Sequence, residues 1–231
     1  MVTGASSGMG RAIAEALSKL GVNLALVARN EEKLREVADM CSANGVNVHI
    51  IKADMSNPDQ VDTAARKISY LFDNKINYLI NCAGVTEENE SVDKADFEQW
   101  QNTLMVNLVN TMRLTQRLTP YIKDCKNDAA IITIGSMSGE KETPGKAAYG
   151  ASKHGIRGFS KTLFEELREN GVKVSLIEPG YVNTPMVTPH HELDKTKMIQ
   201  VGDIVDTVMY ILNSKPTCCP IEIQLKPQRK P

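Results

Sequence analysis

The chain has 231 residues, of which 42% are hydrophobic and 24% are charged. This composition supports a hydrophobic core and excludes an intrinsically disordered chain, while the length suits one large domain or two small ones. The formal net charge of −1 gives no basic field, so we expect neither a nucleic-acid partner nor attraction to an anionic membrane. The longest apolar runs, such as residues 24–28 and 129–134, are too short to span a bilayer.

Short apolar runs rich in Val and Ile recur along the whole chain, and helix-like segments separate them. Most of these runs are apolar throughout, which is typical of parallel strands buried on both faces. The predicted strands are residues 22–28, 46–51, 76–83, 129–136, 172–179 and 221–225. No internal repeat, low-complexity tract or linker interrupts the pattern, so we expect a single domain over residues 1–231.

Three amphipathic segments between the first strands have apolar residues at the helical period of 3.6. The first ends at Gly21, and the third begins at Pro58, a residue favoured in the first helical turn. Their predicted inward residues are Met9, Ala12, Ile13, Ala16, Leu17 and Leu20, then Leu34, Val37, Ala38 and Cys41, then Val61, Ala64, Ala65, Ile68 and Phe72. The βαβ alternation predicts an α/β fold with a doubly wound parallel sheet, the Rossmann fold, and ligands at the carboxyl ends of its strands.

The first strand of this sheet is unusually short in the sequence. Only Met1 and Val2 precede the glycine-rich stretch, whereas a central strand normally has about 5 to 6 residues. We therefore expect either a truncated first strand, which would impair cofactor binding, or a fold that tolerates a two-residue strand.

The glycine-rich stretch TGASSGMG, residues 3–10, leads directly into the first helix. Glycines let the backbone turn tightly and approach a phosphate, whose charge is stabilised by a helix N-terminus. Within a βαβ unit this arrangement predicts a dinucleotide-binding loop. Its predicted cofactor contacts are Gly4, Ser6, Ser7, Gly8, Met9 and Gly10.

Arg29 follows the second predicted strand, at the place where sites for NAD usually have an acidic residue. A guanidinium group suits the 2′-phosphate of NADP(H), so the sequence favours NADP(H) over NAD(H). The alternative is an arginine that lies in solvent at the start of a helix.

Tyr149 and Lys153 are four residues apart, with only Gly, Ala and Ser between them. On a helix these positions share one face, and an ammonium beside a phenol favours the phenolate. The pair is therefore a candidate proton donor and acceptor. The alternative is a surface tyrosine beside a surface lysine, which is common and which these residues alone favour.

Several motifs in the same order resemble those of the short-chain dehydrogenase/reductase family over essentially the whole chain. Besides residues 3–10, they are Asp54 in KADMS, the stretch NCAG at 81–84, Asn107 in MVNL, Ser136 in ITIGS, Y-x-x-x-K at 149–153, and EPGYVNTP at 178–185. Cys82 departs from the family pattern, which has asparagine there. The resemblance adds the predicted cofactor contacts Asp54, Met55, Asn81, Ala83, Gly84, Pro179, Gly180, Val182 and Thr184, besides Tyr149 and Lys153 themselves.

The resemblance also implies a catalytic set and a reaction. Tyr149 would act as general acid and base, Lys153 would hold the nicotinamide ribose, and Ser136 would polarise the substrate oxygen. Asn107 would hold a water of a proton relay. The end of the chain resembles members that act on 3-hydroxy acids, simple alcohols and carbonyl compounds. We expect a small-molecule substrate and a homodimer or homotetramer; the alternative is a non-catalytic NADP(H)-binding protein.

Other residues have smaller expected roles. We expect Gly155 and Gly158 to allow close helix packing, and Trp100 and Phe97 to belong to the core, the alternative being a substrate cage. The resemblance places residues 186–200 at the substrate pocket. The cysteines are odd in number and show no metal-type spacing, and no secretory signal is visible, which favours reduced thiols, a cytoplasmic protein and no metal site. His190 and His191 are predicted to be surface loop residues.

Overall fold

The computed structural model describes residues 1–187 and 193–231 and confirms the doubly wound α/β fold. All seven strands are parallel, in the order β3-β2-β1-β4-β5-β6-β7. They are β1 (Val2–Thr3), β2 (Leu24–Ala28), β3 (Val48–Lys52), β4 (Tyr78–Asn81), β5 (Ala129–Ile134), β6 (Val172–Pro179) and β7 (Glu222–Leu225). The predictions for His190 and His191, and part of the segment 186–200, lie outside the described residues.

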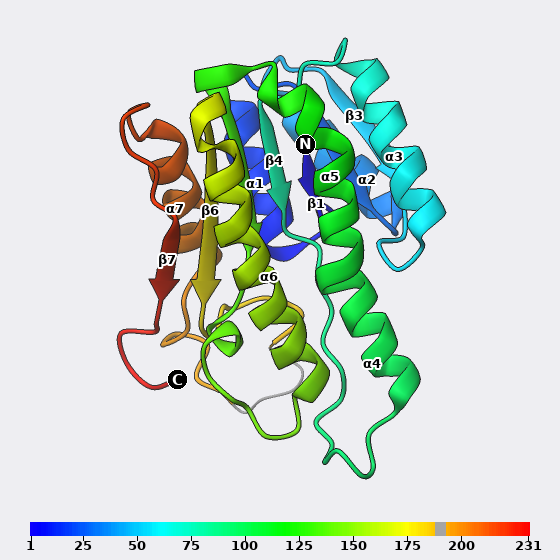
Figure 1. Ribbon diagram of the computed structural model, residues 1–231, viewed down its shortest axis with the longest axis vertical. Helices are drawn as coiled ribbons and strands as arrows, with labels where there is room; N and C mark the ends of the chain where they lie inside the picture. The colour runs from blue at the N-terminus through cyan, green and yellow to red at the C-terminus, as the bar shows by residue number, and fades with distance from the viewer. Residues whose placement is uncertain (188–192) are drawn as a thin grey trace.

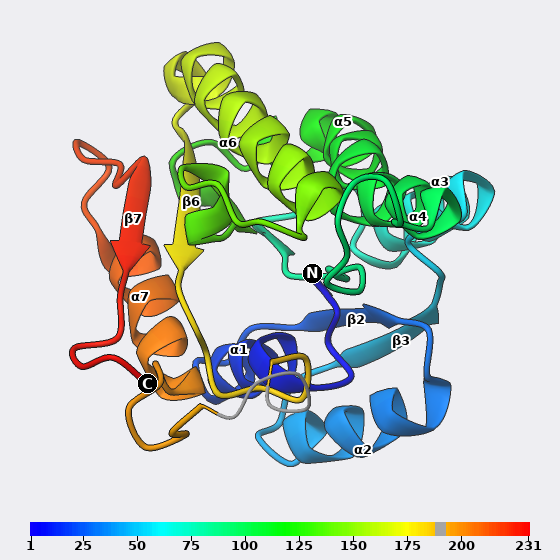
Figure 2. The ribbon, with the colours of Figure 1, turned by 90° about the horizontal axis from the view of Figure 1, so that it is seen from below.

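Helices cover both faces of the sheet and make three layers (Figures 1 and 2). One face carries α1 (Gly8–Lys19), α2 (Glu31–Ser42) and α7 (Val201–Asn213). The other carries α3 (Pro58–Leu71), α4 (Phe97–Leu104), α5 (Asn110–Lys123) and α6 (Ala147–Leu167). A π-helical turn, η1 (Met105–Val109), joins α4 to α5, and three short 3-10 turns are η2 (Lys126–Asp128), η3 (Met137–Gly139) and η4 (Arg168–Asn170).

The core follows from the apolar strands. Every residue of β2, β5 and β6 is buried, as expected for strands with helices on both sides. Two clusters of buried apolar side chains result, one between the sheet and α3, α5 and α6, the other between the sheet and α1, α2 and α7. No helix among residues 1–187 and 193–231 is both long and apolar enough to cross a membrane.

The first strand has two residues, as its sequence implied, and it lies at the centre of the sheet. Val2 is fully buried and pairs with Leu26 of β2 and with Ile80 of β4, while Thr3 pairs with Val27. The side chain of Thr3 extends the connection to β4 beyond the ladder. Its Oγ1 accepts hydrogen bonds from the backbone N–H groups of residues 82 and 83, both at 3.0 Å.

Two predicted core residues are wrong. Leu20 is 61% exposed because it caps the C-terminus of α1, where the chain leaves the helical period. Phe97 is 65% exposed because it is the first residue of α4, outside the interface with the sheet, and its ring contacts that of Trp100. Of the two glycines predicted to allow close packing, Gly155 does so, since an added Cβ would lie 2.7 Å from Leu108 Cδ2. Around Gly158 the described residues leave that space open.

Candidate active site

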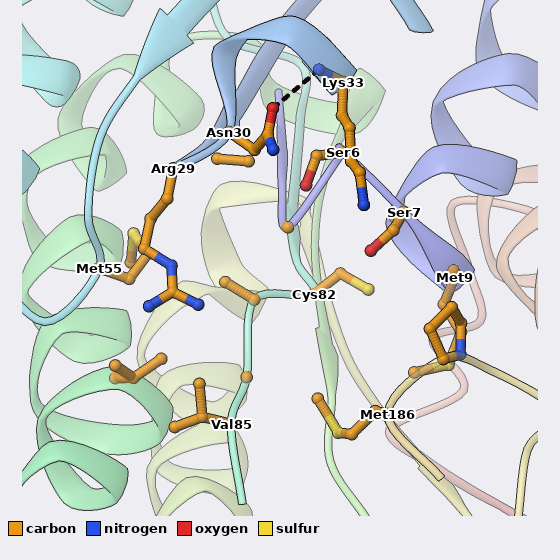
Figure 3. A pocket seen from close by; sticks show the side chains of 18 of the residues that line it. Ser6, Ser7, Met9, Arg29, Asn30, Lys33, Met55, Cys82, Val85 and Met186 are labelled. Carbon is orange, nitrogen blue, oxygen red and sulfur yellow. Dashed lines mark hydrogen bonds between the residues drawn. The ribbon is translucent and has the colours of Figure 1, made fainter. Parts of the chain in front are cut away.

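A cleft of about 270 Å³ opens at the carboxyl ends of β1 to β4 (Figure 3). The loops that follow these four strands supply most of its lining, which agrees with the usual ligand position in a doubly wound sheet. The lining residues are Gly4, Ser6 to Gly10, Ala28 to Asn30, Lys33, Ala53 to Met55, Cys82 to Val85, Val106, and Thr184 to Met186.

The glycine-rich loop is folded so tightly that side chains are excluded at its glycine positions. Gly4 and Gly8 have φ angles of +66° and +52°, in the left-handed region that favours glycine. A Cβ on Gly10 would lie 2.4 Å from the carbonyl oxygen of Gly4. Ser7, the N-cap of α1, makes no side-chain capping bond, so the first turn of this helix is left to an external acceptor.

Two cations extend into the cleft from the start of α2 (Figure 3). Arg29 directly follows β2, and Lys33 lies one helical turn later. Asn30 is the N-cap, and its Oδ1 accepts a hydrogen bond of 2.9 Å from the backbone N–H of Lys33. Sequence reasoning singled out Arg29 and missed Lys33, although their spacing of four residues was a usable signal.

The segment after β4 approaches the cleft with small residues. Cys82, Ala83 and Gly84 line it, whereas Asn81 does not, because its side chain is buried beneath the sheet and donates to Thr115 Oγ1 at 3.1 Å. Burial raises the pKa of the Cys82 thiol to about 12, and the nearby Lys153 ammonium opposes this only in part. Cys82 is therefore a neutral thiol at physiological pH.

Tyr149 and Lys153 share one face of α6, as their spacing predicted. Lys153 Nζ lies 5.5 Å from the centroid of the Tyr149 ring and donates to the carbonyl oxygen of Ile134, at the end of β5. The lysine is only 6% exposed. An added Cβ on Gly84 would lie 4.0 Å from Lys153 Nζ, so the pair adjoins the lining of the cleft without belonging to it.

Asn107 connects this helix to the loop after β4. It lies in the π-helical turn η1, a feature that is frequent at functional sites. Its Oδ1 accepts from the N–H of Val85, and its Nδ2 donates to the carbonyl oxygen of Val85, both at 2.9 Å. Nδ2 also lies 3.2 Å from Ser152 Oγ, and that hydroxyl donates to the carbonyl oxygen of Tyr149 at 2.7 Å. The amide side chain is thus held by protein groups on two sides.

Ser136 lies just after β5 and caps η3, with its Oγ accepting from the N–H of Ser138 at 3.1 Å. The turn η3 packs against α6. An added Cβ on Gly139 would lie 2.9 Å from the carbonyl oxygen of Lys153, which shows how closely they approach. The structure therefore brings Asn107, Ser136, Tyr149 and Lys153 together around the N-terminal half of α6.

The predicted segment after β6 is only partly in the cleft. Thr184 lines it and faces Gly8, since an added Cβ there would lie 3.6 Å from Thr184 Cγ2. Pro179 ends β6, Gly180 donates to the carbonyl oxygen of Leu225, and Val182 is buried and bridges to Ile199. These last three predicted contacts do not line the cleft, because the segment is tied to β7 and to residue 199.

Comparisons with known proteins agree with this arrangement. A model of the family described as short chain dehydrogenase matches residues 1–195. An uncharacterized oxidoreductase of Staphylococcus epidermidis is 33% identical over 227 residues, 98% of this chain and 96% of that protein. The 3-oxoacyl-(acyl-carrier-protein) reductase of Escherichia coli (strain K12) is 34% identical over 186 residues, 80% of this chain and 74% of that protein.

The structural comparison agrees. A metagenomic short-chain oxidoreductase, solved in complex with NADP, is 30% identical and superposes with a TM-score of 0.85 over 99% of this chain and 96% of that one. The match extends from the glycine-rich loop to the last strand. This chain therefore belongs to the short-chain dehydrogenase family and is an NAD(P)-dependent oxidoreductase.

Proposed function

We propose that this enzyme transfers a hydride between NADP(H) and a small alcohol or ketone, with Tyr149 as the general acid and base. The observation that carries the proposal is the Tyr149–Lys153 pair, whose nearly buried ammonium lies 5.5 Å from the phenol ring centroid, beside a dinucleotide-type cleft. A lysine so enclosed, which donates to the main-chain carbonyl oxygen of Ile134, is not an ordinary surface residue beside a surface tyrosine.

The residues of the cleft fit NADP(H). The close approach of Gly10 to Gly4 excludes a side chain at residue 10, and glycines there let the backbone come close to a phosphate. Arg29 and Lys33 offer two positive charges for a 2′-phosphate that carries about −1.5 to −2 at neutral pH, as phosphate monoesters do. The metagenomic relative was solved with NADP, which supports the same choice here. When bound, NADP(H) supplies or accepts the hydride.

The chain's own residues would handle the proton. Tyr149 would donate a proton to the substrate oxygen as a carbonyl becomes an alcohol, and would accept it in the reverse direction. Lys153 would stabilise the phenolate that remains, and Ser136 would donate a hydrogen bond to the same substrate oxygen. Both Nδ2 hydrogens of Asn107 are donated, one to the carbonyl oxygen of Val85 and one to Ser152 Oγ. A relay water would therefore have to donate to the side-chain or main-chain carbonyl oxygen of Asn107.

Three further features extend the proposal. The substrate would be a 3-hydroxy acid, a simple alcohol or a carbonyl compound. The Escherichia coli relative is named a 3-oxoacyl reductase, which supports a substrate with a ketone or hydroxyl group at carbon 3.

All five cysteines are free, in keeping with a cytoplasmic protein. Exposed apolar residues such as Val109 and Met112 offer a surface for a homodimer or homotetramer.

The test is a Tyr149→Phe variant with Tyr210→Phe as the matched control, since Tyr210 is 60% exposed on α7, outside the cleft. We expect Tyr149→Phe to retain NADPH binding in a fluorescence titration, but to lose about 10²–10⁴-fold in kcat on a small diketone. Equal turnover by Tyr149→Phe would refute the catalytic assignment. NADPH binding without turnover of any ketone or 3-hydroxy acid by the wild type would favour a non-catalytic NADP(H)-binding protein.

A further inference from the structure

The helix that bears Tyr149 begins without a cap of its own. Lys146 is the N-cap residue of α6 and makes no side-chain capping bond, and the first turn contains no acidic residue. The first N–H groups of a helix have no partner within the helix and need an acceptor from elsewhere. A capping side chain normally bonds the second or third N–H, and the third belongs to Tyr149.

Glu87 supplies the missing acceptor from a distant part of the chain. It lies in the loop between β4 and α4 and is only 5% exposed. Its Oε1 accepts a hydrogen bond of 2.9 Å from the backbone N–H of Tyr149. In return, the ammonium of Lys146 donates to the carbonyl oxygen of Glu87. Two bonds in opposite directions therefore join this loop to the start of α6.

The same loop is fixed at a second point, two residues earlier. Val85 forms both of its backbone hydrogen bonds with the side chain of Asn107. One short loop thus contacts Asn107 through Val85 and Tyr149 through Glu87. A shift of Glu87 would move the first turn of α6 relative to the π-helical turn that holds Asn107.

The second oxygen of Glu87 argues against a cap for stability alone. Oε2 is buried and has no hydrogen-bond partner among the described residues. Burying a carboxylate oxygen without a partner is unfavourable, whereas a serine or aspartate at residue 146 would cap the helix from its own N-cap position without that penalty. The arrangement instead ties the helix to the loop that also holds Asn107.

We infer that Glu87 is a positioning residue, which sets the place of the Tyr149 phenol by capping α6 at the N–H of Tyr149 itself. This inference rests on the proposed function of Tyr149. Proton transfer is sensitive to geometry, and a displacement of about 1 Å can lower a rate about 10²-fold. Glu87 needs no contact with substrate or cofactor for this role.

The experiment compares Glu87→Ala and Glu87→Gln, with Glu88→Ala as the matched control because Glu88 is the exposed neighbour. Glutamine keeps an oxygen acceptor at nearly the same place and removes the charge. We expect Glu87→Ala to lower kcat about 10–100-fold, with KM and the Kd for NADPH within about threefold of wild type. Glu87→Gln should recover most of the kcat, and Glu88→Ala should match the wild type.

Three results would overturn the inference. Folded Glu87→Ala could retain wild-type kcat, Glu87→Gln could fall as far as Glu87→Ala, which would assign the effect to charge, or KM and Kd could rise together with no loss of kcat. If Glu87→Ala does not fold, Glu87→Asp, whose side chain is one methylene shorter, takes its place with the same criteria. Tyr149→Phe is measured alongside: full activity there would refute the proposed function itself, independently of Glu87.

Discussion

Replacing Gly10 with alanine tests whether the tight loop at the mouth of α1 is the phosphate site. The added Cβ would lie 2.4 Å from the carbonyl oxygen of Gly4 and 2.7 Å from its carbonyl carbon. Real Cβ atoms essentially never come within 3.0 Å of a non-bonded heavy atom beyond the neighbouring residues, so the loop would have to retreat by about 0.6 Å. Gly4 has little room to yield, because it is packed so closely against the next loop that a Cβ on it would lie 3.0 Å from Ala83 Cα.

The expected size of the effect follows from this overlap. Forcing extra atoms into a closely packed site costs about 1–3 kcal/mol. A loop displaced by about half an ångström would also misplace the backbone N–H groups that face the phosphates, and binding geometry is sensitive on that scale. We therefore expect the Kd for NADPH to rise about 10–100-fold, which corresponds to about 1.4–2.8 kcal/mol.

The assay is a fluorescence titration with NADPH, paired with urea unfolding of each variant. Gly202→Ala is the matched control, because Gly202 is exposed on α7 and an added Cβ there would meet nothing within 4 Å. Gly202→Ala should bind NADPH as the wild type does. If Gly10→Ala is destabilised but binds NADPH with unchanged affinity, the loop is not the phosphate site. If it is neither destabilised nor weakened in binding, the steric argument itself fails.

Two further predictions concern charge. Arg29→Asp should weaken NADPH binding about 10–100-fold and leave NADH binding unchanged or stronger. The control Arg66→Asp, on α3 outside the cleft, should change neither affinity. An unaltered cofactor preference in Arg29→Asp would show that Arg29 does not contact the 2′-phosphate. Burial opposes ionisation of Glu222, but hydrogen bonds from Arg157 and Lys161 hold the pKa of its carboxyl at about 2. Because this pKa is lowered from 4.5, its contribution to stability is present above about pH 4.5 and is lost as the pH falls toward 2. The free energy of unfolding, measured with urea between pH 3 and pH 7, should therefore fall less steeply toward acid pH in Glu222→Gln than in the wild type. Equal slopes of this free energy against pH would contradict the assignment.

The pattern of apolar residues along the chain predicted a strand or helix correctly wherever the residues with the expected spacing are also the buried ones. The strand at residues 172–179 and the inward residues Leu34, Val37, Ala38 and Cys41 were predicted correctly, because apolar side chains must leave water whatever the rest of the chain does. Errors gathered at the ends of elements. Leu20 fits the helical period, and Phe97 was expected in the core as an aromatic residue, but each lies at a helix terminus, where the chain no longer follows the buried face.

Position after a strand predicted the glycine-rich loop and Arg29, and the family resemblance added Asp54 and Gly84. Residues of the glycine-rich loop, Arg29, Asp54 and Gly84 line the cleft because each lies in the segment that follows a strand, and parallel strands end at one edge of the sheet. Asn81 does not, because it is still within β4 and its side chain points into the core. Side chains alternate between the two faces of the sheet along a strand. A residue near the end of a strand can therefore be assigned to the cleft or to the core only from its place in this alternation.

The sequence by itself determined the α/β alternation, the glycine-rich turn and the spacing of Tyr149 and Lys153, because each depends on residues within one or two helical turns of each other. Only the tertiary structure decided which backbone groups are held across the sheet. Thr3 bonds to residues 82 and 83, and Glu87 caps the helix of Tyr149, over separations of 79, 80 and 62 residues. No local pattern encodes such pairs, because the partners meet only when the sheet has formed and its loops have converged at one edge.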